Sequence, residues 1–370
     1  MSRRAILALP PRARRPCYCA LAGTRQTGLM MLSSIESYMA RSEKIIAYTC
    51  PYVPAEWIAA HGLRPYRLIP LPREGTPAIP RLEGLCPYAR AFANDVAAGK
   101  DVDAVVVTTM CDQMRRVFDL LGRRTDVPVF LLNVPSTWQT VAAQRLYLDE
   151  LKRLGRFLVR LGGHEPTREE LARVMLDSVG WVGPPNALPR VWGPLLNPRV
   201  SSTDTSLTRG LRTHPTRSDQ RHPEGVPLAI VGGPLMQRDR VLFDTVRDCG
   251  GQIVLDATET GQRGQPEAFD RRRLAEEPLT ELAQAYFHIP DASRRPNSEL
   301  YQWLKEELAR AGARGILFHH YVWCDKWHAE FTRLKEWAKL PVLRLDSEGE
   351  GEMNSARVRN RIHAFLETLQ

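Results

Sequence analysis

DAVVVTTMCDQMRR, residues 103–116, is the stretch of sequence that decides the fold. Its first half is a β-branched run typical of a strand buried on both faces, and its second half is typical of a helix. Cys111 lies at the turn between the two. Buried strands of this kind belong to parallel sheets, which helices cover on both sides. The stretch therefore predicts an α/β layer with a cysteine just beyond the carboxyl end of one strand.

The same alternation continues on both sides of this stretch. Before it, KIIAYT (44–49) predicts a buried strand and PAEWIAAHG (54–62) predicts a short helix. After it, VPVFLL (127–132) predicts a further strand, and a long helix is expected over about 137–161. We expect residues 41–182 to form an N-terminal α/β lobe.

The second half of the chain repeats the pattern. Apolar strands alternate with helices, the strands being expected at 226–231, 252–256, 315–318 and 342–345. We therefore expect residues 226–370 to form a C-terminal α/β lobe, so that the fold class is α/β with two Rossmann-like lobes and parallel sheets. Residues 183–225 are rich in Pro, Ser, Thr and Arg, which predicts an extended crossing between the lobes.

The net charge of +9 does not indicate a nucleic-acid partner. Residues 1–35 carry six arginines and no acidic residue, so the positive excess belongs to a tail rather than to a binding face. We expect residues 1–40 to be a basic tail that is disordered or precedes the true start of the chain. Its apolar stretch is too short for a secretory signal.

Composition places the chain among globular proteins in a reducing compartment. Hydrophobic residues make up 43% and charged residues 25%, and no apolar run reaches the length of a membrane span. The seven cysteines are widely spaced and no export signal precedes them, so a disulfide framework is not expected. We expect a cytoplasmic protein with no membrane contact.

Four cysteines follow predicted strands or lie in loops on the same side of the sheets: Cys50, Cys86, Cys111 and Cys324. Ligands of open α/β sheets bind beyond the carboxyl ends of the strands. Soft thiolates select zinc, Cu(I) or iron–sulfur clusters. The residues by themselves leave the metal open, and they also leave open four unrelated cysteines.

The three histidines around Cys324 could also contribute to a metal site. His319, His320 and His328 flank Cys324 and could ligate zinc, or they could belong to a loop that packs with its aromatic neighbours. Cys249 lies at the end of a predicted helix, a position more typical of a core cysteine. The sequence contains no phosphate-binding G-x-x-x-x-G-K-[ST] motif, so we do not expect the chain itself to hydrolyse ATP.

Eight segments in a fixed order identify a protein family more specifically than any one of them alone. They are TCPYVPAEWIAAHGLRPYRL (49–68), GLCPYARAF (84–92), DAVVVTTMCDQMRR (103–116), FLLNVPST (130–137), GGP near 232, VLDATETGQR (254–263), ILFHHYVWCD (316–325) and RVRNRIHAFLE (357–367). In these segments the chain resembles the 2-hydroxyacyl-CoA dehydratase family. That family includes the D-component of 2-hydroxyglutaryl-CoA dehydratase, the benzoyl-CoA reductase subunits and the double-cubane cluster proteins.

The resemblance implies an iron–sulfur cofactor. Cys86, Cys111 and Cys324 would supply three thiolates to one [4Fe–4S] cluster in the cleft between the lobes. Cys50 would lie near the remaining iron as a fourth ligand or as a pocket residue. The implied enzyme is a radical-type (R)-2-hydroxyacyl-CoA dehydratase, which is a lyase, or an aryl-CoA reductase, and it would work under anaerobic conditions.

The resemblance also implies partners. The chain would pair with a second, similar subunit and would receive low-potential electrons from a separate ATP-dependent iron–sulfur activator protein. Its substrate would be a CoA thioester, to which one electron is delivered. The alternative is a non-catalytic iron–sulfur electron-transfer or cluster-carrier protein with the same fold. The sequence names neither the acyl group nor which of the two subunits this chain is.

Two departures from the family pattern limit the resemblance. The double-cubane branch would place additional cysteines where this chain has Thr260 and Asp291, so a double-cubane cluster is not expected. The proline-rich crossing also replaces a more helical segment. The resemblance therefore does not extend to contacts with the substrate in this segment.

Overall fold

The computed structural model describes residues 44–71, 84–99, 102–179, 225–349 and 351–369. All of them belong to one compact unit, Lys44–Gln370. The predicted tail at 1–40 lies outside the described residues, as does nearly all of the predicted crossing at 183–225. None of the helices in the described part of the chain combines the length and the apolar character needed to cross a bilayer.

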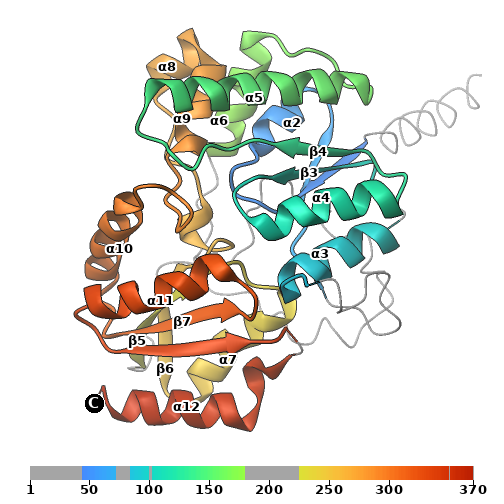
Figure 1. Cartoon of the computed structure of the whole chain (residues 1–370). Coiled ribbons are helices and arrows are strands. Elements are labelled where there is room, and N and C mark those ends of the chain that lie inside the picture. Colours follow the sequence, from blue (N-terminus) through green and yellow to red (C-terminus); the bar gives the residue numbers. More distant parts are fainter. Residues whose placement is uncertain (1–43, 72–83, 100–101, 180–224, 350, 370) are drawn as a thin grey trace, which may run out of the picture. The chain divides into compact units, whose positions relative to one another are not determined.

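The first half of this unit contains a four-stranded parallel sheet in the order β2-β1-β3-β4 (Figure 1). Its strands are β1 (Ile45–Tyr48), β2 (Arg64–Arg67), β3 (Ala104–Thr108) and β4 (Val129–Leu132). In the register of the two inner pairings, Val106 lies between Tyr48 on β1 and Phe130 on β4. Every residue of β3 is buried, which agrees with the β-branched composition that marked it as a strand covered on both faces.

Helices cover both faces of this first sheet. They are α2 (Ala55–Ala60), α3 (Pro87–Ala98), α4 (Asp112–Arg124), α5 (Val141–Arg160) and α6 (Arg168–Val179). The apolar side chains of α3 and α4 form one core with the sheet, and those of α2, α5 and α6 form another on the opposite face. Helix α6 was not expected from the sequence, because only Leu171 and Met175 on it are fully buried.

The second half contains another four-stranded parallel sheet, in the order β6-β5-β7-β8. Its strands are β5 (Val226–Gly232), β6 (Gly251–Ala257), β7 (Gly315–Tyr321) and β8 (Val342–Ser347). Helices α7 (Val241–Asp248) and α12 (Ala356–Glu367) pack on one face, and α10 (Ser298–Ala311) and α11 (Asp325–Trp337) pack on the other. Short 3-10 helices lie at η5 (Gln237–Arg240), η6 (Gln262–Gly264) and η7 (Glu352–Asn354). The prediction of two parallel α/β sheets is confirmed.

Strand β7 is longer than the sequence indicated. The apolar run ends at Phe318, but the strand continues through His319 and His320 to Tyr321, and both histidines are buried. The idea that these two histidines belong to a loop was wrong. Polar side chains inside a buried strand break the apolar pattern on which the expectation depended.

Two helices from the second half of the chain pack on the first sheet. Helices α8 (Arg271–Glu276) and α9 (Pro278–Phe287) join the core of α2, α5 and α6, and Figure 1 shows them in orange beside the green α5. The rings of Tyr147 on α5 and Phe287 on α9 stack with centroids 5.1 Å apart. The hydroxyl of Tyr286 donates a hydrogen bond of 2.7 Å to the buried carboxylate of Glu56. The chain thus crosses back to the first sheet before it completes the second.

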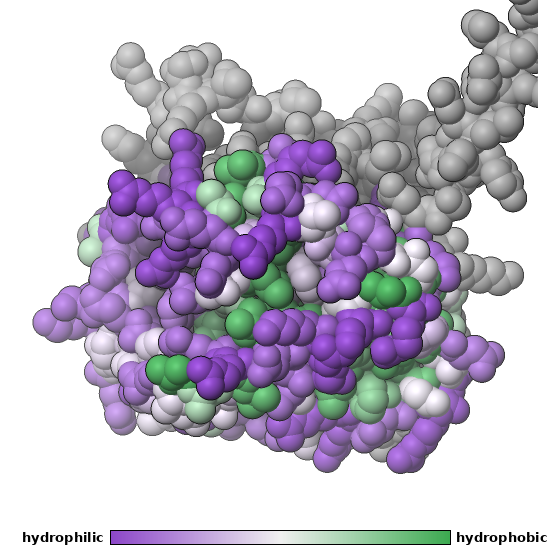
Figure 2. Space-filling view, turned by 90° about the horizontal axis from the view of Figure 1, so that it is seen from above, coloured by the Kyte–Doolittle hydropathy of each residue, from purple (hydrophilic) through white to green (hydrophobic). Residues whose placement is uncertain are grey.

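Figure 2 shows the end of the molecule that carries these helices, seen from above. Hydrophilic side chains dominate this face, with apolar patches between them. Four of the exposed large apolar side chains lie on α5 and α6, namely Val141, Leu146, Val159 and Leu176. Apart from these side chains the face is mostly polar, as expected for helices whose inner sides form the core.

Candidate functional site

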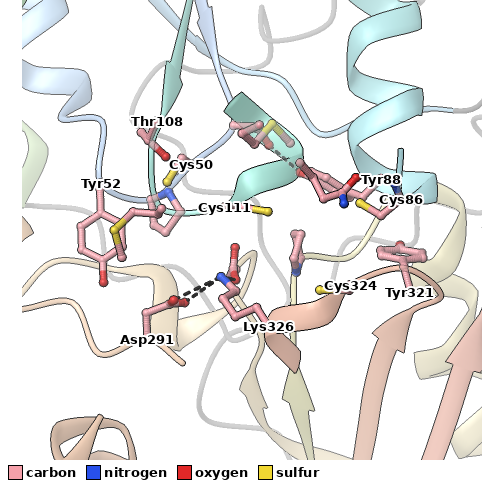
Figure 3. Close-up of a pocket in the computed structure, with 17 residues that line it drawn as sticks. Cys50, Tyr52, Cys86, Tyr88, Thr108, Cys111, Asp291, Tyr321, Cys324 and Lys326 are labelled. Carbon is pink, nitrogen blue, oxygen red and sulfur yellow. Dashed lines mark hydrogen bonds and ion pairs between the residues drawn. The ribbon is translucent and has the colours of Figure 1, made fainter. Parts of the chain in front are cut away.

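One cavity brings together all four cysteines predicted from the sequence (Figure 3). It lies where the carboxyl ends of strands from both sheets meet, and it measures about 640 Å³, including the part that is open to solvent. The cysteines come from segments far apart in the chain and line the cavity together: Cys50, Cys86, Cys111 and Cys324. This is the location that the strand-end rule for open α/β sheets predicts.

Cys86 is the N-cap residue of α3. Its Sγ accepts a hydrogen bond from the backbone N–H of Ala89 at 3.4 Å, and its own N–H donates to the side-chain carbonyl of Gln113 at 2.8 Å. Pro87 occupies the first helical position, where the missing N–H costs nothing. The Cys-Pro pair thus begins the helix and fixes the thiol at its amino end.

Cys111 and Cys324 occupy equivalent positions in the two halves of the chain. Cys111 is the N-cap of α4 after strand β3, and Cys324 is the N-cap of α11 after strand β7. Trp323, directly before Cys324, is exposed and has a φ of 64°, a left-handed conformation that a non-glycine residue rarely adopts. Three thiols thus stand at helix amino ends, where the partial positive charge of the helix favours anionic groups.

Cys50 differs from the other three because it follows strand β1 without capping a helix. Its side chain is partly buried and packs against the core of the first sheet. Burial raises the pKa of the Cys50 thiol to about 12. Cys50 lines the same cavity as the other three cysteines, but unlike them it does not lie at the amino end of a helix.

Burial also raises the pKa of the other three thiols. Burial raises the pKa of Cys86 well above its usual value, and the neighbouring Cys111 and Cys324 raise it further. Burial raises the pKa of Cys324 to about 12. A bound metal removes this penalty, because a coordinating thiol is deprotonated by the charge of the metal. One buried and two partly buried thiols around one cavity therefore form a donor set that suits a cationic centre.

Charged residues that the sequence did not single out line the same cavity. The Lys326 ammonium lies 2.5 Å from Glu259 Oε1 and 3.1 Å from Asp291 Oδ1. Burial lowers the pKa of Lys326, but Asp291 and Glu259 outweigh this effect and hold the pKa well above its usual value. In the sequence these residues carried no periodic or spacing signal; Asp291 was noted only because it is not a cysteine.

Aromatic residues form the wall beside Cys86. Tyr321 donates a hydrogen bond of 2.5 Å to Asp239, and it accepts one of 2.8 Å from the backbone N–H of Met236. Tyr88 lies next to it, with the ring centroids 6.0 Å apart, and its hydroxyl is 2.5 Å from that of Thr49. Burial raises the pKa of Asp239 to about 6. These contacts fix two rings against the cavity.

The histidines beside Cys324 do not line the cavity. His320 lies 2.6 Å from Asp346, and Arg344 donates to both His320 and Asp346. His328 lies 3.1 Å from the Arg344 guanidinium. An arginine among them makes this group unsuitable for a cation.

Cys249 also lies away from the cavity, at the carboxyl end of α7, where its thiol is 3.7 Å from the carbonyl of Arg359. Within the described ranges, no three His, Cys, Asp or Glu side chains stand close enough to ligate a single metal ion. A four-iron cluster places each cysteine on a different iron and so spaces its ligands more widely than one ion does. The chemistry of the donor set fits such a cluster: three soft thiols from separate helix amino ends around one cavity with largely apolar walls.

Comparisons with known proteins agree with the resemblance seen in the sequence. No curated protein matches the chain. One solved structure with some likeness is that of the SBP FpvC from Pseudomonas aeruginosa in complex with Mn2+; it is 9% identical, and the match covers 89% of this chain and 99% of that one. Its TM-score of 0.22 is too low to carry any argument.

A family model, by contrast, covers most of the sequence. The model for the 2-hydroxyglutaryl-CoA dehydratase D-component matches residues 50–178 and 205–369. The two matched segments include all four cavity cysteines, the whole second sheet, and every strand of the first sheet except β1. The chain therefore belongs to the 2-hydroxyglutaryl-CoA dehydratase D-component family.

Proposed function

We propose that the chain is an iron–sulfur subunit of a 2-hydroxyacyl-CoA dehydratase or of a related aryl-CoA reductase, with Cys86, Cys111 and Cys324 as the ligands of one [4Fe–4S] cluster. The observation that carries the proposal is the convergence of these three thiols on a single cavity in a chain of this family. Cys50 lines the same cavity and is the candidate for a fourth ligand or a residue of the substrate pocket.

The residues of the cavity have distinct tasks in this proposal. A bound cluster supplies a low-potential electron and an iron with an open coordination position. The helix amino ends at Cys86, Cys111 and Cys324 stabilise the negative charge of the thiolates. Tyr88 and Tyr321 keep the cavity apolar, which strengthens every electrostatic contact inside it.

The substrate and the partners are part of the same proposal. Family membership supports a CoA thioester as the substrate, a second similar subunit, and an ATP-dependent iron–sulfur activator as the electron donor. Among the described residues the cavity presents no feature that selects one acyl group. The alternative is an electron-transfer or cluster-carrier protein. It would be favoured if the chain held the cluster but passed no electron to any CoA thioester when the partner and the activator were present.

The first test is the metal content of protein purified without oxygen. We expect about four irons and four acid-labile sulfides per chain, with an electron paramagnetic resonance signal after reduction. Protein that contains zinc, or no metal after anaerobic reconstitution with iron and sulfide, would refute the proposal.

Substituting single cysteines tests the ligand assignment. We expect Cys111→Ala to lose most of the iron, because a cluster left with two protein thiolates is poorly held. Cys249→Ala is the matched control, since that thiol lies outside the cavity, and it should keep the iron content of the unaltered protein. Equal iron content in the two variants, with both folded by circular dichroism, would show that Cys111 is not a ligand.

A further inference from the structure

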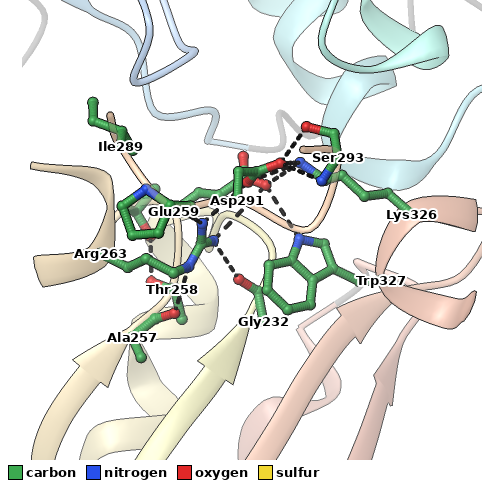
Figure 4. Close-up of polar contacts among 12 residues, drawn as sticks. Gly232, Ala257, Thr258, Glu259, Arg263, Ile289, Asp291, Ser293, Lys326 and Trp327 are labelled. Atoms are coloured by element: carbon green, nitrogen blue, oxygen red, sulfur yellow. Dashed lines mark hydrogen bonds and ion pairs between the residues drawn. The ribbon is translucent and has the colours of Figure 1, made fainter. Parts of the chain in front are cut away.

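A buried group of four charges lies beside the thiols and has no part in the ligand set. It comprises Glu259, Arg263, Asp291 and Lys326 (Figure 4). The side chains of Arg263 and Asp291 are 0% and 2% exposed, and those of Glu259 and Lys326 are 12% and 14% exposed. Burying four charged groups is costly unless each one is paired, so their arrangement needs a reason.

The two cations of this group have different surroundings. Arg263 uses its guanidinium on the backbone carbonyls of Gly232, Ala257 and Pro290 and on the carboxylate of Asp291. It also stacks on Trp327, with the guanidinium carbon 4.8 Å from the ring centroid, and it does not line the cavity. Arg263 therefore holds together the loops beneath the site.

Lys326, in contrast, lines the cavity. Figure 3 shows its ammonium between the Asp291 carboxylate and the thiols of Cys111 and Cys324. Three contacts to Glu259 and Asp291, at 2.5, 3.1 and 3.3 Å, fix the ammonium in this position. The ammonium is therefore a fixed positive charge that lines the same cavity as the two thiols.

We propose that Lys326 is a positioning residue that stabilises the added electron on the centre bound by Cys111 and Cys324, and thereby raises the reduction potential of that centre. This inference rests on the proposed function, because it needs a cluster at these thiols. A centre that gains one electron becomes more negative by one charge. A fixed cation in a cavity with apolar walls favours the reduced state, because attraction between charges is strong where little water screens it.

Removing the charge at Lys326 gives the test. We expect Lys326→Met to shift the one-electron equilibrium of the cluster at least tenfold towards the oxidised form, which lowers the midpoint potential by about 59 mV. Lys326→Arg keeps the positive charge, so its midpoint potential should fall by no more than half as much as that of Lys326→Met. Lys335→Met removes an exposed lysine from the same helix and is the matched control, with no change in potential. The potentials are measured by anaerobic redox titration followed by electron paramagnetic resonance, beside the iron content of each variant.

The outcomes separate this inference from the proposed function. An unaltered protein without iron would remove the proposed function, whereas loaded Lys326→Met protein with an unchanged potential would overturn only the role of Lys326. Lys326→Met leaves two buried carboxylates with one cation, so the variant Lys326→Met/Glu259→Gln restores the charge balance. That double variant should also lower the potential, though by less, because loss of the negative charge of Glu259 offsets part of the loss of the positive charge of Lys326. Failure of both variants to fold or to hold iron would assign Lys326 a purely structural role and overturn the inference.

Discussion

His319 lies inside strand β7 with a fully buried imidazole, and neither ring nitrogen has a hydrogen-bond partner among the described residues. Burial lowers the pKa of His319 to about 3. The folded protein thus keeps this ring neutral at pH values where the unfolded chain protonates it. The unfolded chain binds a proton below its ordinary pKa of about 6.5, so stability falls as the pH drops from there towards 3.

The expected loss from this one group is about 2 kcal/mol between pH 7 and pH 5. His319→Leu removes the titration, so the free energy of unfolding of this variant should change by about 2 kcal/mol less over that interval. Urea unfolding at both pH values measures the difference. His363→Leu is the control, because His363 is exposed on α12. A pH dependence in His319→Leu equal to that of the unaltered protein would show that the ring is protonated or solvated in the fold.

The candidate site could be predicted from the sequence only in its cysteines. Cys86, Cys111 and Cys324 carried a signal because each comes beside an apolar strand or a helix start, and their segments resemble a family. Lys326 and Asp291 carried none, since 35 positions separate them and their contact exists only in the folded chain. Pairings over such distances depend on how whole loops pack, which local pattern does not encode.

At the scale of elements, β5 and β7 approach each other closely at Gly232. A Cβ added at Gly232 would lie 1.8 Å from the backbone carbonyl oxygen of His319. The φ of Gly232 is 156°, a backbone conformation that residues with a Cβ rarely adopt. Gly232 also pairs with His319 in the register of the two strands and supplies a carbonyl to Arg263. A glycine at this position lets the strands approach and keeps the loops beneath the cavity in place.

We expect Gly232→Ala to lower the free energy of unfolding by about 3 kcal/mol, because a backbone atom cannot move aside as a flexible side chain can. Gly122→Ala is the matched control: it lies on the exposed side of α4, and nothing is within 4 Å of an added Cβ. That change should raise stability by about 0.5–1 kcal/mol, because alanine favours helices over glycine. Thermal unfolding of both variants measures the difference, and an equal effect of the two would disprove the close approach.

The elements themselves were largely predictable where their burial is uniform. The fully buried strand β3 and the apolar part of β5 were expected at nearly their observed positions, since such runs have few alternatives. Helix α6 and the end of β7 were not, because the first has little buried surface and the second buries two histidines. The pattern of apolar residues predicts an element correctly where the whole element is buried. It fails where the element is mostly exposed or where polar side chains are buried in it.

At the scale of the whole molecule, the order of the sequence does not match the order of packing. Helices α8 and α9 follow the second sheet's first strands in sequence, yet they complete the core of the first sheet. Phe287 of α9 stacks on Tyr147 of α5, and Leu282 of α9 is buried in the same core. Tyr52, in the loop after β1, donates a hydrogen bond to the carbonyl of Ile289. The first sheet therefore lacks part of its core until α8 and α9, at residues 271–287, have been added.

This arrangement predicts that the first half of the chain does not fold by itself. A fragment of residues 40–180 would expose the apolar faces of α2, α5 and α6 that α9 covers, and we expect it to bind an apolar dye and to unfold without a sharp transition. The same fragment with residues 268–296 attached through a flexible Gly/Ser linker should regain a cooperative transition, because it then carries the missing helices. Attaching a segment of equal length from elsewhere, residues 298–326 with α10 and β7, is the control and should not rescue it. Cooperative unfolding of the 40–180 fragment without any addition would show that α8 and α9 merely cover a core that is already complete, and it would make the first sheet an independent folding unit.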